Sequence, residues 1–235
     1  MKVHLLVAVI TLSVINFFCQ PLLAQSSTPP VSSREIDSAY SNTIETRTAK
    51  IMTALALTDS DKSNRVHQII VSHYYALRAR DEAVNDELND LPKGSSEWRS
   101  QRNTMVLAMS QPLHDRFVAQ LSAQLTPEQI DTVKDQLTYG KVQFTYNAYC
   151  SIVPALTDDE KAKIMDLLKQ AREVAIEGGN AGEKSDIFQQ YKDQINSYLK
   201  TNGIDMDQAT REWVAKQAAQ KSSGQTNASA ATQAN

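Results

Sequence analysis

The residue types best suited to meeting a sugar gather in one short segment, residues 139–149, between two strong helix-start signals. Aromatic rings can stack on the apolar face of a pyranose, while amide and amine groups can hydrogen-bond its hydroxyl groups. Five residues of the segment are therefore candidate ligand-binding residues: Tyr139, Lys141, Phe144, Tyr146 and Asn147. An aromatic residue between two helices can also be a plug over the core, and that alternative stays open.

A second candidate cluster lies on a predicted helix over 59–89, where His73, Tyr74 and Arg78 follow one another closely. Tyr74 and Arg78 are four residues apart and so share one helix face. A histidine and a tyrosine beside an arginine could act as base, acid and carboxylate neutraliser in a polysaccharide lyase. The alternative is structural, because Arg78 with Glu82 is an ordinary i,i+4 ion pair and His73 lies on the buried stripe.

Metal, cofactor and nucleophile signals are missing from the sequence. His67 and His73 are six residues apart and do not share a helix face, and no zinc-binding histidine or cysteine spacing occurs. Cys150 stands in an apolar run and is most simply a small buried residue. We predict no metal site and no cofactor, and the sequence names no catalytic residue.

The charge pattern argues against a nucleic-acid partner. The net charge is −3, and the nearest approach to a basic cluster, Arg78 and Arg80, is followed at once by Asp81 and Glu82. A surface that follows phosphates needs clustered lysine and arginine. We therefore expect no nucleic-acid binding.

The first 24 residues are typical of a signal peptide, with Lys2, an apolar run over 5–18 and the small residue Ala24. We expect export to the periplasm or the cell exterior. The apolar run is too short for a comfortable membrane span, so no membrane insertion is expected once the signal is removed. A linker should follow over 25–33.

The body of the chain is predicted to be all-α. Between residues 31 and 177 the only glycines are Gly94 and Gly140, and apolar residues recur at helical spacing. We expect a single-domain bundle of about seven helices over 34–218, interrupted by the irregular aromatic segment. A Ser32 cap should open the first helix, Pro112 should kink or restart the third, and 219–235 should be a disordered tail.

Three Leu-Thr pairs precede predicted helices, ending at Thr58, Thr126 and Thr157, and each threonine is followed three residues later by Asp, Gln or Glu. The simple interpretation is that all three are capping boxes. The alternative is kinship with periplasmic chaperones of the Spy and CpxP type, which this chain resembles in carrying Leu-Thr-x-x-Gln at a helix start. Only the motif around Thr126 fits that pattern fully.

A resemblance to a known family covers nearly the whole chain after the leader. The segments that carry it are 125–129 (LTPEQ), 137–142 (LTYGKV), 145–146 (TY), 155–157 (ALT), 171–173 (ARE) and 191–199 (YKDQINSYL). They resemble domain-of-unknown-function family 3826, a family of exported bacterial proteins found mainly in polysaccharide-degrading Bacteroidetes and described as sugar-binding. The resemblance implies a carbohydrate-associated binding or accessory protein of a polysaccharide-utilisation system, with a glycan as partner. A glycan-active enzyme of lyase or hydrolase type and a periplasmic chaperone or scaffold are the alternatives.

Overall fold

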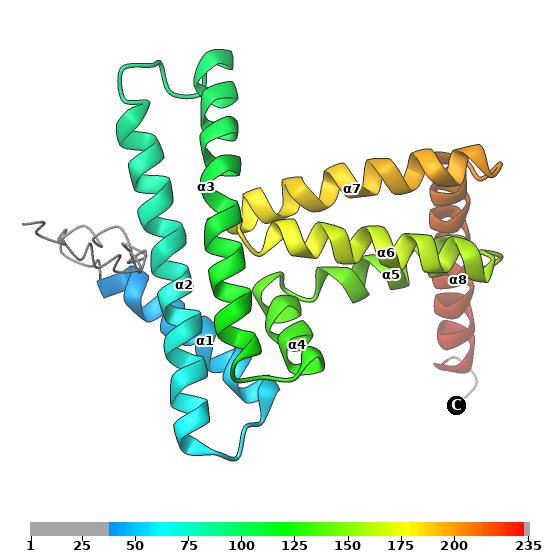
Figure 1. The fold of residues 1–235 in the computed structure, drawn as a ribbon. Helices are drawn as coiled ribbons and strands as arrows, with labels where there is room; N and C mark the ends of the chain where they lie inside the picture. Colours follow the sequence, from blue (N-terminus) through cyan, green and yellow to red (C-terminus); the bar gives the residue numbers. More distant parts are fainter. Residues whose placement is uncertain (1–37, 233–235) are drawn as a thin grey trace, which may run out of the picture. The chain divides into compact units, whose positions relative to one another are not determined.

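The structure, a computed structural model, describes the backbone of residues 38–232 and the side chains of residues 38–220. The predicted signal peptide (1–24), linker (25–33) and Ser32 cap lie outside the described residues. Within them the chain is all-helical, with eight helices and no strand (Figure 1). The helices are α1 (Ser38–Leu55), α2 (Ser60–Glu87), α3 (Ser96–Ser122), α4 (Pro127–Leu137), α5 (Lys141–Ile152), α6 (Asp158–Ala175), α7 (Ala181–Thr201) and α8 (Met206–Thr232).

Two apolar cores hold these helices together. The first core lies among α1, α2, the end of α3 and α4, and its fully buried members include Ile44, Ile70 and Leu121. The second core lies among α5, α6 and α7, with Ile164, Leu168 and Ile195 fully buried. Side-by-side pairs dominate the packing: α2 runs beside α3, and α6 runs beside α7 (Figure 1). Burial of these aliphatic stripes is the main stabilising term for each core.

Local capping chemistry sets several boundaries where the sequence predicted them. Thr126 opens α4 and Thr157 opens α6, each with a complete capping box. The expectation is wrong for Thr58, because Asp59 caps α2 by accepting a hydrogen bond from the Lys62 amide. Asp59 stands one residue nearer to the helix, where a short carboxylate reaches the third amide directly.

The prediction of an irregular aromatic segment over 139–149 is wrong for most of its length. Residues 141–152 form helix α5, and only Thr138, Tyr139 and Gly140 separate it from α4. Tyr139 (φ 59°) and Gly140 (φ 65°) are both left-handed. Their amides close α4 by donating hydrogen bonds to the Gln136 and Asp135 carbonyls, and Gly140 directly precedes α5. Val142 and Tyr149 are buried on the inner side of α5. Burial at helical spacing outweighs the weak helix propensity of aromatic and β-branched residues.

α3 continues through Pro112 from Ser96 to Ser122, so the helix does not restart there, and the proline is exposed. α8 extends to Thr232. No helix in the described part of the chain is long and apolar enough to cross a membrane.

Candidate functional site

A surface of tyrosine and arginine side chains joins α1 to α2. The Tyr40 and Tyr75 rings meet edge to face with centroids 5.8 Å apart, and the Arg78 guanidinium lies 4.5 Å from the Tyr40 ring centroid. The Tyr40 hydroxyl donates a hydrogen bond to the Tyr74 carbonyl, at 2.9 Å. Rings locked against one another in this way lose little entropy when a ligand stacks on them.

Tyr139 adds the predicted aromatic segment to this surface. It is 48% exposed and has φ 59°, an uncommon conformation for a residue other than glycine. Burial raises the pKa of Tyr74 to about 12, and the nearby Tyr139 and Tyr40 hydroxyls add to that increase while Arg47 opposes it. We call Tyr40, Tyr74, Tyr75, Arg78 and Tyr139 the tyrosine surface. The tyrosine surface includes Tyr139 of the predicted segment and both Tyr74 and Arg78 of the predicted α2 cluster.

The other four candidates from the segment lie on α5. Phe144 is 78% exposed, and Asn147 accepts a hydrogen bond from the Gln143 amide at 2.7 Å. Tyr146 packs against the second core, and Lys141 is half-buried at the start of the helix. For Tyr146 the core-plug interpretation is therefore the better one, and the segment does not form one continuous ligand platform.

His73 is separated from its predicted partners on α2. Its ring stacks on Phe117 of α3 with centroids 3.9 Å apart, and its side chain is almost completely buried. Burial lowers the pKa of His73 to about 4. Arg78 forms the predicted i,i+4 ion pair with Glu82, with 2.9 Å between Nε and Oε1. The α2 cluster therefore divides: Tyr74 and Arg78 belong to the tyrosine surface, and His73 belongs to a buried polar group.

That buried group is centred on Arg80, whose side chain the sequence did not single out. Arg80 is 2% exposed and donates hydrogen bonds to the Glu177 carbonyl (2.8 Å), to Ser110 Oγ (2.9 Å) and to Asp81 Oδ1 (2.9 Å). These bonds tie α2 to α3 and to the turn between α6 and α7. A buried guanidinium keeps its charge, so such partners are required.

Glu177 and two histidines occupy the same region. The Glu177 carboxylate is buried, with Oε1 at 3.4 Å from His114 Nδ1 and 3.8 Å from His73 Nε2. Neither carboxylate oxygen has a hydrogen-bond partner among the described residues. Glu177 raises the pKa of His114 above its usual value, because a neighbouring carboxylate favours the protonated ring.

Lys184 completes the buried group at the end of α6. Its Nζ donates hydrogen bonds to the Ala175 and Ile176 carbonyls, at 3.0 and 3.2 Å, where the helix dipole favours a cation. Burial lowers the pKa of Lys184 to about 8. The turn after α6 can pack closely against Asp81 of α2 because it is formed by Gly178 and Gly179. A Cβ on Gly179 would collide with the Asp81 carboxylate.

We call Arg80, Glu177, Lys184, His73 and His114, with the neighbouring pairs between α4 and α6, the charged seam. Those pairs are Arg172 with Asp131 and Asp135 (2.6 and 2.8 Å) and Lys134 with Glu173 (2.6 Å). The sequence offers one signal for this turn, the double glycine Gly178-Gly179 after α6. No group of His, Cys, Asp or Glu in the described residues is arranged to hold a metal ion.

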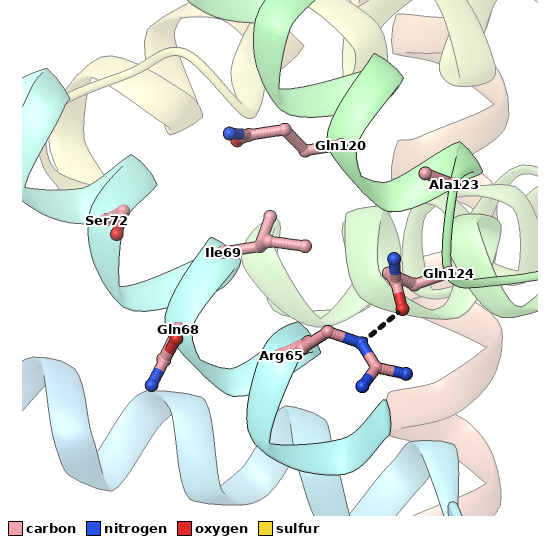
Figure 2. Close-up of a pocket in the computed structure, with 7 residues that line it drawn as sticks. All are labelled: Arg65, Gln68, Ile69, Ser72, Gln120, Ala123 and Gln124. Atoms are coloured by element: carbon pink, nitrogen blue, oxygen red, sulfur yellow. Dashed lines mark hydrogen bonds between the residues drawn. The ribbon is translucent and has the colours of Figure 1, made fainter. Parts of the chain in front are cut away.

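A groove of about 370 Å³ lies elsewhere, between α2 and α3 (Figure 2). Its walls are lined by Arg65, Gln68, Ile69, Ser72, Gln120, Ala123 and Gln124. None of the predicted binding residues lines it. No sequence pattern predicts this groove, because glutamine and serine on an exposed helix face are ordinary surface residues.

Comparison with known proteins supports the family resemblance. No curated protein matches this sequence. The family described as "Protein of unknown function (DUF3826)" matches residues 41–219, which span α1 from its first turn to the first half of α8. Because the match covers most of the chain, this protein belongs to the DUF3826 family.

Proposed function

We propose that this chain is an exported carbohydrate-associated binding or accessory protein of a polysaccharide-utilisation system, and that the tyrosine surface holds the saccharide. The observation that carries the proposal is the packed cluster of Tyr40, Tyr75 and Arg78, with the half-exposed Tyr139 near enough to Tyr74 to influence the pKa of its hydroxyl. The left-handed conformation of Tyr139 belongs to the turn that ends α4, where the Tyr139 amide donates a hydrogen bond to the Gln136 carbonyl at 3.1 Å.

The chemistry of the surface fits a sugar. The edge of the Tyr40–Tyr75 pair and the Tyr139 ring offer aromatic area for the apolar face of a pyranose, and Arg78 offers donors beside them. Arg47 of α1 is half-buried and close enough to Tyr40 and Tyr74 to act on the pKa of each hydroxyl. Tyrosine hydroxyls and guanidinium groups together can read several sugar hydroxyls.

The two alternatives draw less support from the same residues. A lyase site would need His73, Tyr74 and Arg78 together, and the buried His73 ring turns instead to Phe117 and Glu177. A chaperone would need a continuous exposed apolar face. The exposed large apolar residues among the described side chains are instead spread over α3, α5, α6, α8 and the turn after α4: Leu107, Met109, Tyr139, Phe144, Val174 and Val214.

A glycan array on the chain from Gln25 onward tests the proposal. We expect binding to at least one plant or host polysaccharide, and we expect Tyr139→Asn to abolish it, because asparagine keeps the left-handed backbone while removing the ring. Phe144→Ala is the matched control, since it removes an exposed aromatic residue that lies outside the tyrosine surface. Silence across the array would reject sugar binding. Loss of binding with Phe144→Ala alone would move the site to α5.

A further inference from the structure

The groove between α2 and α3 has a lining of unusual charge for this chain. The whole protein carries a net charge of −3, yet Arg65 is the one charged residue among the seven that line the groove, and none is acidic. The remaining polar groups are three glutamine amides and the Ser72 hydroxyl. Ile69 and Ala123 supply the apolar part. A site of this kind favours an anionic ligand that also carries hydroxyl groups.

Arg65 is held in a defined orientation. Its Nε donates a hydrogen bond to Gln124 Oε1 at 2.8 Å, across the groove from α2 to the turn after α3 (Figure 2). Within the described part of the chain its two terminal nitrogens make no hydrogen bond or ion pair, and the Asp59 carboxylate lies near enough for the Arg65 charge to help lower the Asp59 pKa. A guanidinium fixed through Nε presents those two nitrogens as a planar fork, which matches the two oxygens of a carboxylate.

The amide groups lie along the groove next to this fork. Figure 2 shows the Gln120 side chain extending from α3 toward Ser72 of α2, with Ile69 between the two helices. A primary amide offers two donors and an acceptor, so it can bind neighbouring hydroxyl groups in either role. The apolar floor at Ile69 can contact the C–H face of a ring.

The groove borders the tyrosine surface along α2. Tyr75 follows Ser72 by three residues and Gln68 by seven, so the three share one stripe of the helix. Tyr75 in turn contacts Tyr40. From Gln68 to Tyr75 the helix rises about 10 Å, so a ligand that reaches both places must be longer than a monosaccharide.

We infer that the groove binds the acidic sugar of a uronic-acid-containing oligosaccharide, whose neighbouring rings lie on the tyrosine surface. The carboxylate lies against the terminal nitrogens of Arg65, Gln124 positions the guanidinium, and Gln120 with Ser72 binds hydroxyl groups of the same ring. The inference rests on the proposed function, because it assigns a substrate class to the same binding surface.

A matched pair of ligands tests the groove: an oligogalacturonide tetrasaccharide and its methyl ester, in which every carboxylate is replaced by an uncharged ester on the same sugar chain. We measure both affinities by titration calorimetry on the chain from Gln25 onward. The acid should bind about tenfold more tightly than the ester, as expected for one charge-assisted contact. Arg65→Gln should remove this difference and leave the affinity for the ester unchanged.

Two further variants sharpen the result. Arg65→Lys should restore the preference for the acid only in part, because an ammonium group cannot bind both oxygens in a plane. Arg211→Gln on α8 removes an exposed arginine outside the groove and should leave both affinities as they were. Equal loss with Arg211→Gln and Arg65→Gln would overturn the inference, because it would show a general effect of net charge.

The inference and the proposed function fail in different ways. If both ligands bind equally and Tyr139→Asn abolishes their binding, the groove assignment is wrong and the proposed function stands. If neither ligand binds while another polysaccharide on the array does, the uronate class is wrong. Silence across the whole array rejects the proposed function, and the groove inference is rejected with it.

Discussion

The first core, among α1 to α4, and the second core, among α5 to α7, are closed by aliphatic and aromatic side chains, whereas charged groups fill much of the contact between them. Apolar burial is non-directional, so many side-chain arrangements can close a core. Buried charges require specific partners at short range. The cores thus supply stability to each set of helices, and the charged seam selects how α6 and α7 meet α2, α3 and α4.

The seam is not purely polar. Ile176, the residue just before Glu177, is fully buried in the first core although it belongs to the end of α6. The apolar side chain of Ile176 and the carboxylate of Glu177 therefore both lie in the contact between the two cores. The comparison predicts that changes to buried charges in the seam cost as much as large truncations in a core, while charges elsewhere on the surface cost little.

The largest effect is expected for Arg80→Leu. The variant removes the guanidinium donor of the buried Glu177 carbonyl and leaves Asp81 with Arg102 alone, at 3.6 Å, and breaking a buried charged contact costs about 3–5 kcal/mol. Urea denaturation followed by circular dichroism measures the loss in free energy of unfolding. Lys163→Gln is the control, because Lys163 forms a surface pair with Asp166 that is worth less than about 1 kcal/mol. Similar losses for the two variants would contradict the special role of the seam.

The pH dependence of stability should also come from the seam. Because Glu177 raises the pKa of His114 above 6.5, the contribution of His114 is complete below pH 6.5 and is lost as the pH rises through the folded pKa. Because burial lowers the pKa of His73 to about 4, its contribution is complete above pH 6.5 and is lost as the pH falls toward 4. Stability should therefore be greatest near neutral pH, with slopes of up to about 1.4 kcal/mol per pH unit for each histidine.

Denaturation of two histidine variants between about pH 4 and pH 8 separates these contributions. His114→Gln should flatten the decline above pH 6.5 and keep the decline below it. Lys184, whose pKa burial lowers to about 8, titrates mainly above this range. His67→Gln is the control, because His67 pairs with Glu45 at the surface, away from the seam. An unchanged alkaline slope in His114→Gln would show that His114 and Glu177 are not coupled.

The parts of the fold that follow from local chemistry could be predicted from the sequence. Thr126 and Thr157 cap their helices through contacts within four residues, and the left-handed turn at Tyr139 and Gly140 ends α4 through hydrogen bonds to carbonyls within five residues. The helical state of 141–152 depends on distant contacts, such as the 2.7 Å hydrogen bond from the Tyr149 hydroxyl to Asn196 Oδ1. A sequence window cannot contain such a partner, so aromatic residues there were taken for a loop.

The candidate site follows the same rule. Tyr74 and Arg78 share a helix face by periodicity, and the sequence grouped them, but it could not show that Tyr139 from a later turn comes near enough to influence the Tyr74 pKa. Arg80 and Glu177 resemble ordinary surface charges until the turn after α6 brings them together. Residue type alone does not separate a buried charge from an exposed one, because its partners come from other helices.

The smallest expected effect compares the two cores directly through their capping boxes. Thr126→Ala on α4 and Thr157→Ala on α6 each remove a side chain that accepts a hydrogen bond from the amide three residues later, which costs about 1 kcal/mol. Thr58→Ala is the matched control, since Asp59 caps α2 and Thr58 is exposed. If the seam couples the cores, hydrogen exchange should rise in both cores for either variant. If Thr157→Ala speeds exchange only in α5–α7, the second core opens alone. Its loss of stability would then not reach the first core through the charged seam.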